Sequence, residues 1–280
     1  MSGYLQIVLL CLAMSFSSAT YAQDNKLGEI EIVMNFKDNS WNIIHEQNAY
    51  RAHSPASMTK IVTLALVFQA LSEGEIALKD KIPISQYASK QKGVTMSLKA
   101  GAYMTVKQAI EATIVKSSND TSVVLAEHIA GSERAFVDMM NRFVLIEVGI
   151  TQTRFEDASG LSKSDFQFTT AYDMALIMRY IATKHPDYYE TYFAKTSFWY
   201  QKWHGSGLRN RLTKKGVDGL KTGYINKSQC NIVVSFTHGD ARWVVVLMNY
   251  KKRKKSPSCF PREKRINQLI AQYKTSSTAF

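Results

Sequence analysis

The sequence predicts an α+β fold in which one antiparallel sheet is built from both ends of the chain. Near the N-terminus, residues 30–36 alternate between apolar and polar side chains, which indicates a strand. Residues 231–236 and 242–248 are two further β-rich runs, separated by the tight turn 238–240. The long middle part shows helical spacing of its apolar residues. This order favours a single sheet with helices packed on it and an inserted helical subdomain.

The first elements are predicted to form a hairpin that leads into a buried helix. Residues 41–44 form the return strand after the turn-rich residues 37–40. The apolar run 61–68 is too continuous for a surface helix and long enough for a buried one. We expect this helix to begin near Ser57 and to end at residues 73–75, where a glycine lies between two glutamates.

The middle of the chain carries further helices, separated by polar junctions. Apolar spacing predicts them over residues 105–115, 123–131, 132–144 and 169–181. Residues 80–103 and 183–216 lack this spacing, so we expect loops and irregular, aromatic-rich structure there. A short strand at 217–220 and a last helix over 262–273 complete the pattern. No repeat or linker is visible, and residues 23–280 are therefore expected to form a single domain.

The N-terminus is typical of a secretory signal peptide over residues 1–22. Residues 5–16 are apolar and small or polar residues follow, so we expect cleavage after Ala22. The first four residues carry no Lys or Arg, which leaves an uncleaved anchor as the alternative. The mature chain is expected outside the cytoplasm, secreted or periplasmic. It keeps Cys230 and Cys259, which form either one disulfide or two buried thiols.

Composition indicates a folded protein that is attracted to anionic surfaces. The 280 residues are 45% hydrophobic, enough for a sizeable core, and the formal net charge is +12. The densest basic run is Lys251 to Lys255, which we interpret as a solvated loop, with contact to an anionic wall or membrane surface as the alternative. No nucleic-acid-binding motif accompanies it, so nucleic acid is not an expected partner.

Ser57 and Lys60 are the first candidate catalytic pair. Their spacing of three residues places both side chains on one face of a helix. A serine hydroxyl becomes a good nucleophile when a neighbour takes its proton, and a lysine can do so if burial or nearby positive charge keeps it neutral. Alone, the same pattern also fits a helix cap with a solvated lysine.

Two further motifs offer partners for this pair. Ser117-Ser118-Asn119 lies at a sharp junction between two helices, where a hydroxyl and an amide can point into a cleft or cap the helix. Lys221-Thr222-Gly223 lies on or beside a strand and combines a charge, a hydroxyl and a glycine that lets a ligand approach the backbone. Its alternative is an edge-strand lysine followed by a turn glycine.

The three motifs together resemble the low-molecular-mass penicillin-binding proteins, the serine D-alanyl-D-alanine carboxypeptidases and D,D-endopeptidases of the bacterial wall. Ser-x-x-Lys, Ser-x-Asn and Lys-Thr-Gly occur in the family's order, beginning at residues 57, 117 and 221. The flanking segments 55–60, 118–120, 159–161, 173–175 and 217–223 also look like this family. The resemblance runs from about residue 30 to residue 270 and implies the β-lactamase/transpeptidase-like fold.

The resemblance assigns catalytic roles to three side chains. Ser57 would attack the D-Ala–D-Ala carbonyl and form an acyl-enzyme, with Lys60 as its base. Ser117 would relay a proton to the leaving amine. The backbone N–H groups of Ser57 and Tyr224 would form the oxyanion hole.

The remaining site residues would bind substrate, which is expected to be a peptidoglycan stem peptide or a β-lactam. Asn119 would hold the substrate amide, Lys221 would raise the positive potential, and Thr222 would bind the terminal carboxylate. Gly223 and Tyr224 would line the site beside them. No metal or cofactor is expected, because the six histidines are scattered and no phosphate-binding loop is present.

Several departures from the family narrow the expectation. The chain ends soon after the catalytic domain should close, so we expect no second β-rich domain or amphipathic anchor, an outline typical of endopeptidases or minimal carboxypeptidases. Lys251 stands where the family often has an arginine, and Tyr224 replaces a smaller residue. A β-lactamase is the nearest alternative, but Glu156 lacks the partner asparagine of the deacylating loop. A penicillin-binding sensor that acylates and stalls is the other alternative.

Overall fold

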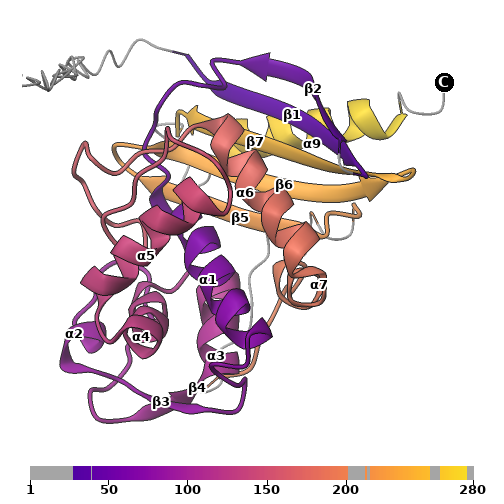
Figure 1. Ribbon diagram of the computed structural model, residues 1–280. Coiled ribbons are helices and arrows are strands. Elements are labelled where there is room, and N and C mark those ends of the chain that lie inside the picture. The colour runs from indigo at the N-terminus through magenta and orange to yellow at the C-terminus, as the bar shows by residue number, and fades with distance from the viewer. Residues whose placement is uncertain (1–27, 39, 201–211, 213–214, 253–258, 276–280) are drawn as a thin grey trace, which may run out of the picture.

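The structure is a computed structural model that describes residues 28–38, 40–200, 212, 215–252 and 259–275. The predicted signal peptide and residues 253–255 of the basic run lie outside the described residues. A twisted sheet occupies one half of the molecule and a helical subdomain the other (Figure 1). Helix α9 lies behind the sheet, and α6 and α7 lie in front of it.

The sheet joins the two ends of the chain, as predicted. Its five strands have the order β2-β1-β7-β6-β5 and all neighbouring strands are antiparallel. The central pairing aligns Ile30 with Met248. The strands span Ile30–Lys37 (β1), Ser40–Gln47 (β2), Gly219–Ile225 (β5), Gln229–His238 (β6) and Ala241–Tyr250 (β7). The α+β class with an antiparallel sheet is therefore confirmed.

Helices cover both faces of the sheet, which explains the unbroken valine run of β7. Val244 and Val246 pack on the face covered by α6 (Ala171–Lys184), whereas Val245 belongs to the core beneath α9 (Phe260–Thr275). Because successive side chains of a strand point to opposite faces, a strand buried on both sides needs apolar residues at every position. Helix α7 (Pro186–Phe193) also lies against the sheet, beside β5.

The helical subdomain is organised around α1, the predicted buried helix. It spans Lys60–Ser72 and has only Gln69 and Ser72 outside the buried class. Helices α4 and α5 pack around it together with α6. The remaining elements of this subdomain and the helices just named have the following bounds: β3 Lys81–Pro83, α2 Gln86–Ser89, β4 Tyr103–Thr105, α3 Val106–Glu111, α4 Asn119–Ala130 and α5 Glu133–Ile146.

Two expectations about local structure were wrong, and a third had the wrong bounds. Residues 80–103 are not only loop, because β3 pairs with β4 and α2 lies between them; these elements are too short to show a period. Residues 183–216 contain α7, whose buried face is made of Tyr189, Tyr192 and Phe193 at helical spacing. The strand expected at 217–220 is β5, which extends through the Lys-Thr-Gly motif to Ile225.

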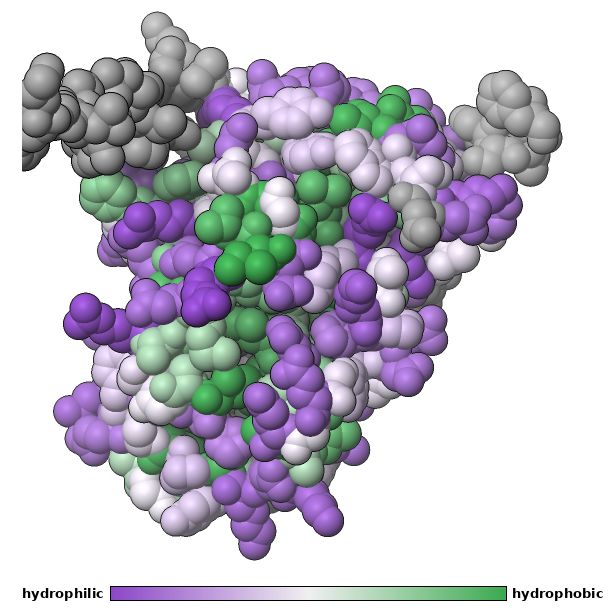
Figure 2. Space-filling model, viewed as in Figure 1, coloured by the Kyte–Doolittle hydropathy of each residue, from purple (hydrophilic) through white to green (hydrophobic). Residues whose placement is uncertain are grey.

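The surface combines a hydrophilic margin with limited apolar areas. Figure 2 shows apolar side chains gathered near the middle of the visible face, surrounded by hydrophilic ones. The most exposed large hydrophobic residues of α5 are Leu145 and Ile146, which are 55% and 61% exposed. Within the described ranges, no helix combines the length and the apolar character needed to cross a membrane.

Cys230 and Cys259 form a disulfide, which resolves the alternative left open by the sequence. Their Cα atoms lie 5.8 Å apart, and the bond ties the beginning of β6 to the residue before α9. The two cysteines are 29 residues apart, and the basic run 251–255 lies between them in the sequence. Arg262 of α9 also donates to the Asn231 carbonyl at 2.8 Å, so helix and strand are joined twice.

We expect the double substitution Cys230→Ala/Cys259→Ala to lower the free energy of unfolding by about 2–4 kcal/mol, because the unfolded chain loses its cross-link. Urea unfolding followed by circular dichroism measures the difference. The wild-type protein under reducing conditions should unfold like the double variant. Equal unfolding free energies for the oxidised wild type and the variant would contradict a disulfide that stabilises this fold.

Candidate active site

Ser57 lies in a 3₁₀ turn, Ala56–Thr59, that directly precedes α1. The approach to this turn is fixed by Asn231 of β6, whose side-chain Nδ2 donates to the Ser54 carbonyl at 2.9 Å. On the sheet side, β5 presses against the turn at Gly223. A Cβ atom on Gly223 would come within 2.6 Å of the Pro55 carbonyl oxygen, so only a glycine permits this close approach.

A second glycine, which belongs to the segment 159–161, also confines this turn. Gly160 has a φ of +85°, and a Cβ atom there would overlap the carbonyl group of Ala56. Ala56 itself has a positive φ of 47°. Gly160 and Gly223 thus hold the turn between a loop and a strand. The position of Ser57 is set by tertiary contacts on two sides as well as by the helix that follows.

Lys60 is completely buried and reaches three oxygen acceptors. Its Nζ lies 3.2 Å from Ser57 Oγ, 2.7 Å from Asn119 Oδ1 and 2.5 Å from the Ser159 carbonyl oxygen. Burial lowers the pKa of Lys60 to about 7, and the carboxylates of Asp157 and Asp120 oppose this shift. A substantial neutral fraction therefore exists near neutral pH, and neutral Nζ can accept a proton from the Ser57 hydroxyl.

Ser117 is placed by an irregular helix end. Helix α3 continues into a π-helical segment, Ala112–Lys116, and Ser117 ends it in the left-handed region with φ 64° and ψ 38°. π-Helical segments are rare and are often found at functional sites. A left-handed conformation is likewise uncommon for a serine and also clusters at such sites. The buried Lys221 of β5 donates from Nζ to Ser117 Oγ at 2.8 Å and to the Thr222 carbonyl at 2.9 Å.

Asn119 is held from both ends of its amide group. Its Oδ1 accepts from Lys60, and its Nδ2 donates to the Lys92 carbonyl at 2.6 Å. Its backbone N–H donates to the Val94 carbonyl at 2.7 Å, which fixes the start of α4 against the loop 92–98. The next residue, Asp120, accepts from the Met96 backbone N–H, which ties the same loop down again.

The structure brings the predicted residues together as two hydrogen-bonded groups. One contains Ser57, Lys60 and Asn119, and the other contains Ser117 and Lys221. The chain itself joins them, because Ser117 and Asn119 are two residues apart. Gly223 joins them as well, since it follows Lys221 closely on β5 and contacts the turn that carries Ser57.

Thr222 and Tyr224 occupy the less buried positions of β5. Thr222 is half-buried, and Tyr224 is 40% exposed with its hydroxyl donating to Asn226. The Lys252 ammonium group lies 5.1 Å from the centre of the Tyr224 ring, a distance suited to a cation–π contact. The described beginning of the basic run therefore lies at this end of β5.

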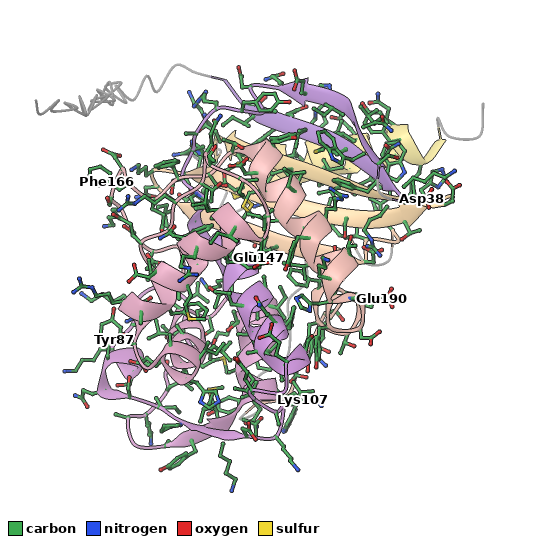
Figure 3. All side chains as sticks on the ribbon, viewed as in Figure 1. Asp38, Tyr87, Lys107, Glu147, Phe166 and Glu190 are labelled. Atoms are coloured by element: carbon green, nitrogen blue, oxygen red, sulfur yellow. A yellow bond between two sulfur atoms is a disulfide. The ribbon has the colours of Figure 1, made fainter. Side chains whose placement is uncertain are left out.

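The Ser159 carbonyl accepts a hydrogen bond from Lys60, and the sequence did not predict this contact. Residues 159–161 resemble the family, but the resemblance gives no role to their backbone. They belong to a turn, residues 157–162, that is followed by a loop on which Phe166 is 66% exposed. Figure 3 shows Phe166 projecting at the margin of the molecule, away from the helices.

No group of three or more His, Cys, Asp or Glu side chains in the described parts of the chain is arranged to hold a metal ion. The site consists of hydroxyl, amine and amide groups with backbone carbonyls. A nucleophilic hydroxyl beside a buried amine is suited to acyl transfer.

Comparison with known proteins decides the family. The family model described as D-alanyl-D-alanine carboxypeptidase matches residues 20–252. The chain belongs to this family. Its relatives include the D-alanyl-D-alanine carboxypeptidases DacF of Bacillus subtilis, 34% identical over 215 residues, and DacA of Escherichia coli, 33% identical over 264 residues. These alignments cover 73% and 85% of this chain but 53% and 62% of the relatives, so the chain spans only part of their length.

Solved structures of the carboxypeptidase family confirm the predicted fold. Penicillin binding protein 5 from Haemophilus influenzae aligns with a TM-score of 0.78 and 28% identity, over 88% of this chain and 70% of that one. Penicillin binding protein 6B from Escherichia coli aligns with a TM-score of 0.73 and 29% identity, over 88% and 77% of the two chains. The transpeptidase-like α+β fold inferred from the three motifs is therefore correct.

We expect Gly160→Ala to destabilise the protein by about 1–3 kcal/mol more than Gly131→Ala. Both glycines have a positive φ, 85° and 76°, but a Cβ atom at Gly131 meets nothing within 4 Å. The difference between the variants therefore isolates the overlap with Ala56. Urea unfolding measures it, and equal destabilisation by the two substitutions would show that the turn is not confined at Gly160.

Proposed function

We propose that this protein is a serine D,D-peptidase that removes the terminal D-alanine from peptidoglycan stem peptides through an acyl-enzyme. The observation that carries the proposal is the buried Lys60 amine, within hydrogen-bond distance of Ser57 Oγ and with a pKa lowered to about 7. Membership of the D-alanyl-D-alanine carboxypeptidase family and the carboxypeptidase names of the relatives support it.

Acylation begins when neutral Lys60 accepts the Ser57 proton and Ser57 Oγ attacks the carbonyl of the D-Ala–D-Ala bond. The negative charge that develops on the carbonyl oxygen needs hydrogen-bond donors. The backbone N–H groups of Ser57 and Tyr224 are our candidates, because Gly223, next to Tyr224, contacts the turn that carries Ser57. Loss of one such donor typically lowers the rate by about 10²–10³.

The leaving amine must receive a proton as the peptide bond breaks. The hydroxyl of Ser117, which accepts from Lys221 Nζ at 2.8 Å, is suited to relay to the leaving amine the proton that Lys60 took from Ser57. Departure of D-alanine leaves an ester on Ser57. Because Lys60 has passed its proton on through Ser117, its amine is neutral again. It can then take a proton from the water that attacks this ester, so Lys60 serves both half-reactions.

Substrate binding is assigned to β5 and the beginning of α4. Asn119 uses one amide hydrogen on Lys92 and keeps a second for the carbonyl of the substrate's penultimate amide. Lys221 would raise the local positive potential, and Thr222 would bind the terminal carboxylate of the substrate. Tyr224 at the exposed end of β5 would border the same subsite. β-Lactams present a similar amide and carboxylate, and structural relatives carry the name penicillin binding protein.

Peptidoglycan lies outside the cytoplasm, and we propose that this protein acts there. The apolar residues 5–16 followed by small residues support cleavage of a signal peptide, which leaves residues 23–280 as the catalytic domain. We extend the proposal to the basic run 251–255, whose charge favours contact with anionic wall or membrane surfaces.

We expect the purified protein to convert pentapeptide muropeptides to tetrapeptides, and Ser57→Ala to convert none, because the substitution removes the nucleophile. Mass spectrometry of digests measures the loss of one alanine. Asp165→Asn serves as a control, since Asp165 pairs with Lys227 on a loop outside the proposed machinery. Cleavage of cross-linked dimers with intact pentapeptides would indicate an endopeptidase, and rapid turnover of penicillin with no muropeptide product would indicate a β-lactamase. If the wild-type protein forms neither tetrapeptides from pentapeptides nor monomers from cross-linked dimers, the peptidase proposal is wrong.

We expect the rate of acylation by penicillin to rise with pH and to level off above about pH 7. The reason is the sign of the Lys60 shift: the pKa is lowered, so the amine is neutral above it and protonated, hence inactive as a base, below it. The rate should fall about tenfold per pH unit well below the midpoint. Stopped-time labelling with a fluorescent penicillin measures it, and a rate that stays flat between about pH 5 and about pH 8 would contradict Lys60 as the base.

A further inference from the structure

The turn 157–162 is folded around the carboxylate of Asp157. Asp157 Oδ1 accepts hydrogen bonds from the backbone N–H groups of Ser159 at 2.7 Å, Leu161 at 3.3 Å and Gly160. Its Oδ2 accepts from the Ser162 N–H at 2.5 Å. Four consecutive N–H groups therefore converge on one side chain, an arrangement that binds an anion well. Without that side chain, these backbone donors would have to find other partners.

This turn touches the active site at two points. The Ser159 carbonyl oxygen lies 2.5 Å from Lys60 Nζ, and Gly160 is pressed against the carbonyl of Ala56. Both contacts come from the residues whose N–H groups bind Asp157. The direction of the Ser159 carbonyl depends on the peptide plane that also carries the Gly160 N–H. Asp157 therefore fixes the orientation of the Ser159 carbonyl, a hydrogen-bond acceptor of Lys60, although Asp157 makes no hydrogen bond to Lys60 itself within the described part of the chain.

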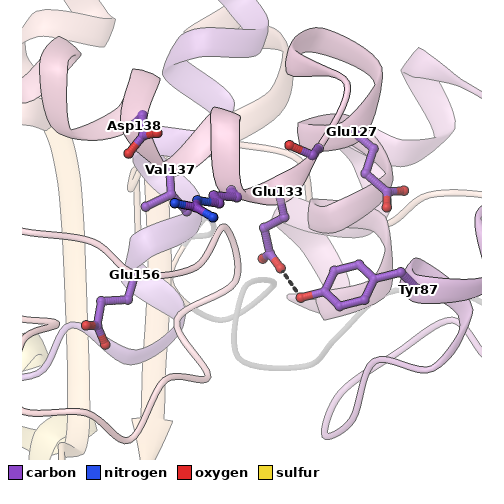
Figure 4. Close-up of a pocket in the computed structure, with 8 residues that line it drawn as sticks. Tyr87, Glu127, Glu133, Val137, Asp138 and Glu156 are labelled. Atoms are coloured by element: carbon purple, nitrogen blue, oxygen red, sulfur yellow. Dashed lines mark hydrogen bonds between the residues drawn. The ribbon is translucent and has the colours of Figure 1, made fainter.

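Two neighbouring elements hold the residue before this carbonyl. The Ala158 N–H donates to Glu133 Oε1 of α5 at 2.9 Å, and the Ala158 carbonyl accepts from Thr63 Oγ1 of α1 at 2.7 Å. Figure 4 shows Glu133 directed toward Tyr87, whose hydroxyl donates to its second oxygen at 2.5 Å. Ala158 is thereby fixed in place. The peptides after Ala158 have Asp157 as their common acceptor.

We propose that Asp157 is a positioning residue, whose carboxylate folds the 157–162 turn so that the Ser159 carbonyl is held against the Lys60 amine. Its influence on acylation rests on the function proposed above. Its influence on the structure of the turn and on the titration of Lys60 does not rest on that function, because these are properties of the folded protein without substrate. The two consequences can therefore be measured separately.

The charge of Asp157 adds a signature that a purely structural residue would not have. Among the described residues, the carboxylates of Asp157 in the turn and Asp120 on α4 act on Lys60. Lys221 of β5 belongs to the neighbouring hydrogen-bonded group, and Glu133 of α5 interacts with Asp157. Asp157 favours the protonated form of Lys60, in opposition to burial. Removal of this negative charge must therefore lower the pKa of Lys60 and move its titration to lower pH.

Three variants separate geometry from charge. Asp157→Asn keeps one side-chain oxygen for the turn but loses the charge, whereas Asp157→Ala loses both. Glu156→Gln is the matched control: Glu156 is the adjacent carboxylate, its oxygen accepts from the Ser162 hydroxyl at 2.9 Å, and Figure 4 shows it lining a pocket with Glu133. If Asp157→Ala does not fold, the Asn variant alone still tests the charge.

The decisive measurement is the titration of Lys60 by NMR in protein labelled at lysine Cε, with the signal assigned by Lys60→Arg. We expect a lower midpoint in Asp157→Asn than in the wild type and an unchanged midpoint in Glu156→Gln. In Asp157→Ala, we expect amide hydrogen exchange at residues 159–162 to accelerate by about tenfold or more. An unchanged or raised midpoint in Asp157→Asn, or unchanged exchange in Asp157→Ala, overturns the proposal.

Acylation by penicillin supplies the functional arm. We expect Asp157→Ala to lower the acylation rate by about ten- to a hundredfold, because the base is displaced, while Glu156→Gln acylates like the wild type. Acylation of Asp157→Ala at the wild-type rate overturns the positioning role. If the wild type itself forms no adduct, the proposed function fails, and the NMR titration and amide exchange still decide whether Asp157 positions Lys60.

Discussion

Everything around the site depends on keeping one lysine amine out of water. Transfer of a charged ammonium group into a protein interior costs several kcal/mol, which favours the neutral amine unless nearby acceptors and negative charges compensate. Lys60 is fully buried yet meets three oxygen atoms, so it is held in place without being locked in its charged form. This balance between burial and acceptors gives the site a base near neutral pH.

The three acceptors come from three separate parts of the chain, and each part has its own support. The turn bearing Ser57 is confined by two glycines, Asn119 is tied to the loop 92–98, and the Ser159 carbonyl is oriented by the turn 157–162. Each support acts directly on the residue that it positions, through a close backbone contact or a hydrogen bond. The sheet and helices bring these pieces to one place, and the local hydrogen bonds set the final orientation of each.

Sequence spacing predicted what lies within one element and motif order predicted which elements meet. Ser57 and Lys60 were expected to be adjacent because three residues separate them, and the meeting of Ser117 with Lys221 followed from resemblance, since helical or strand periods carry no such information. The Ser159 carbonyl was not foreseen, because every residue has a carbonyl and only tertiary structure selects one. Helix α7 was missed because its buried face consists of tyrosines and a phenylalanine, which were interpreted as irregular aromatic sequence.

The pairing of β1 with β7 has a consequence for how this protein is made. Ile30 pairs with Met248, so the centre of the sheet cannot form until the chain has been translated that far. Ser57 and Lys60 are likewise synthesised long before Lys221. Contacts so distant along the chain make folding slow compared with that of a protein stabilised by local contacts. A nascent chain that has reached only α6 therefore contains Ser57 and Lys60 but no β5 beside them. The hydrogen-bonded groups of the site therefore cannot be complete until β5 has been translated, and the sheet that holds β5 cannot close until β7 follows.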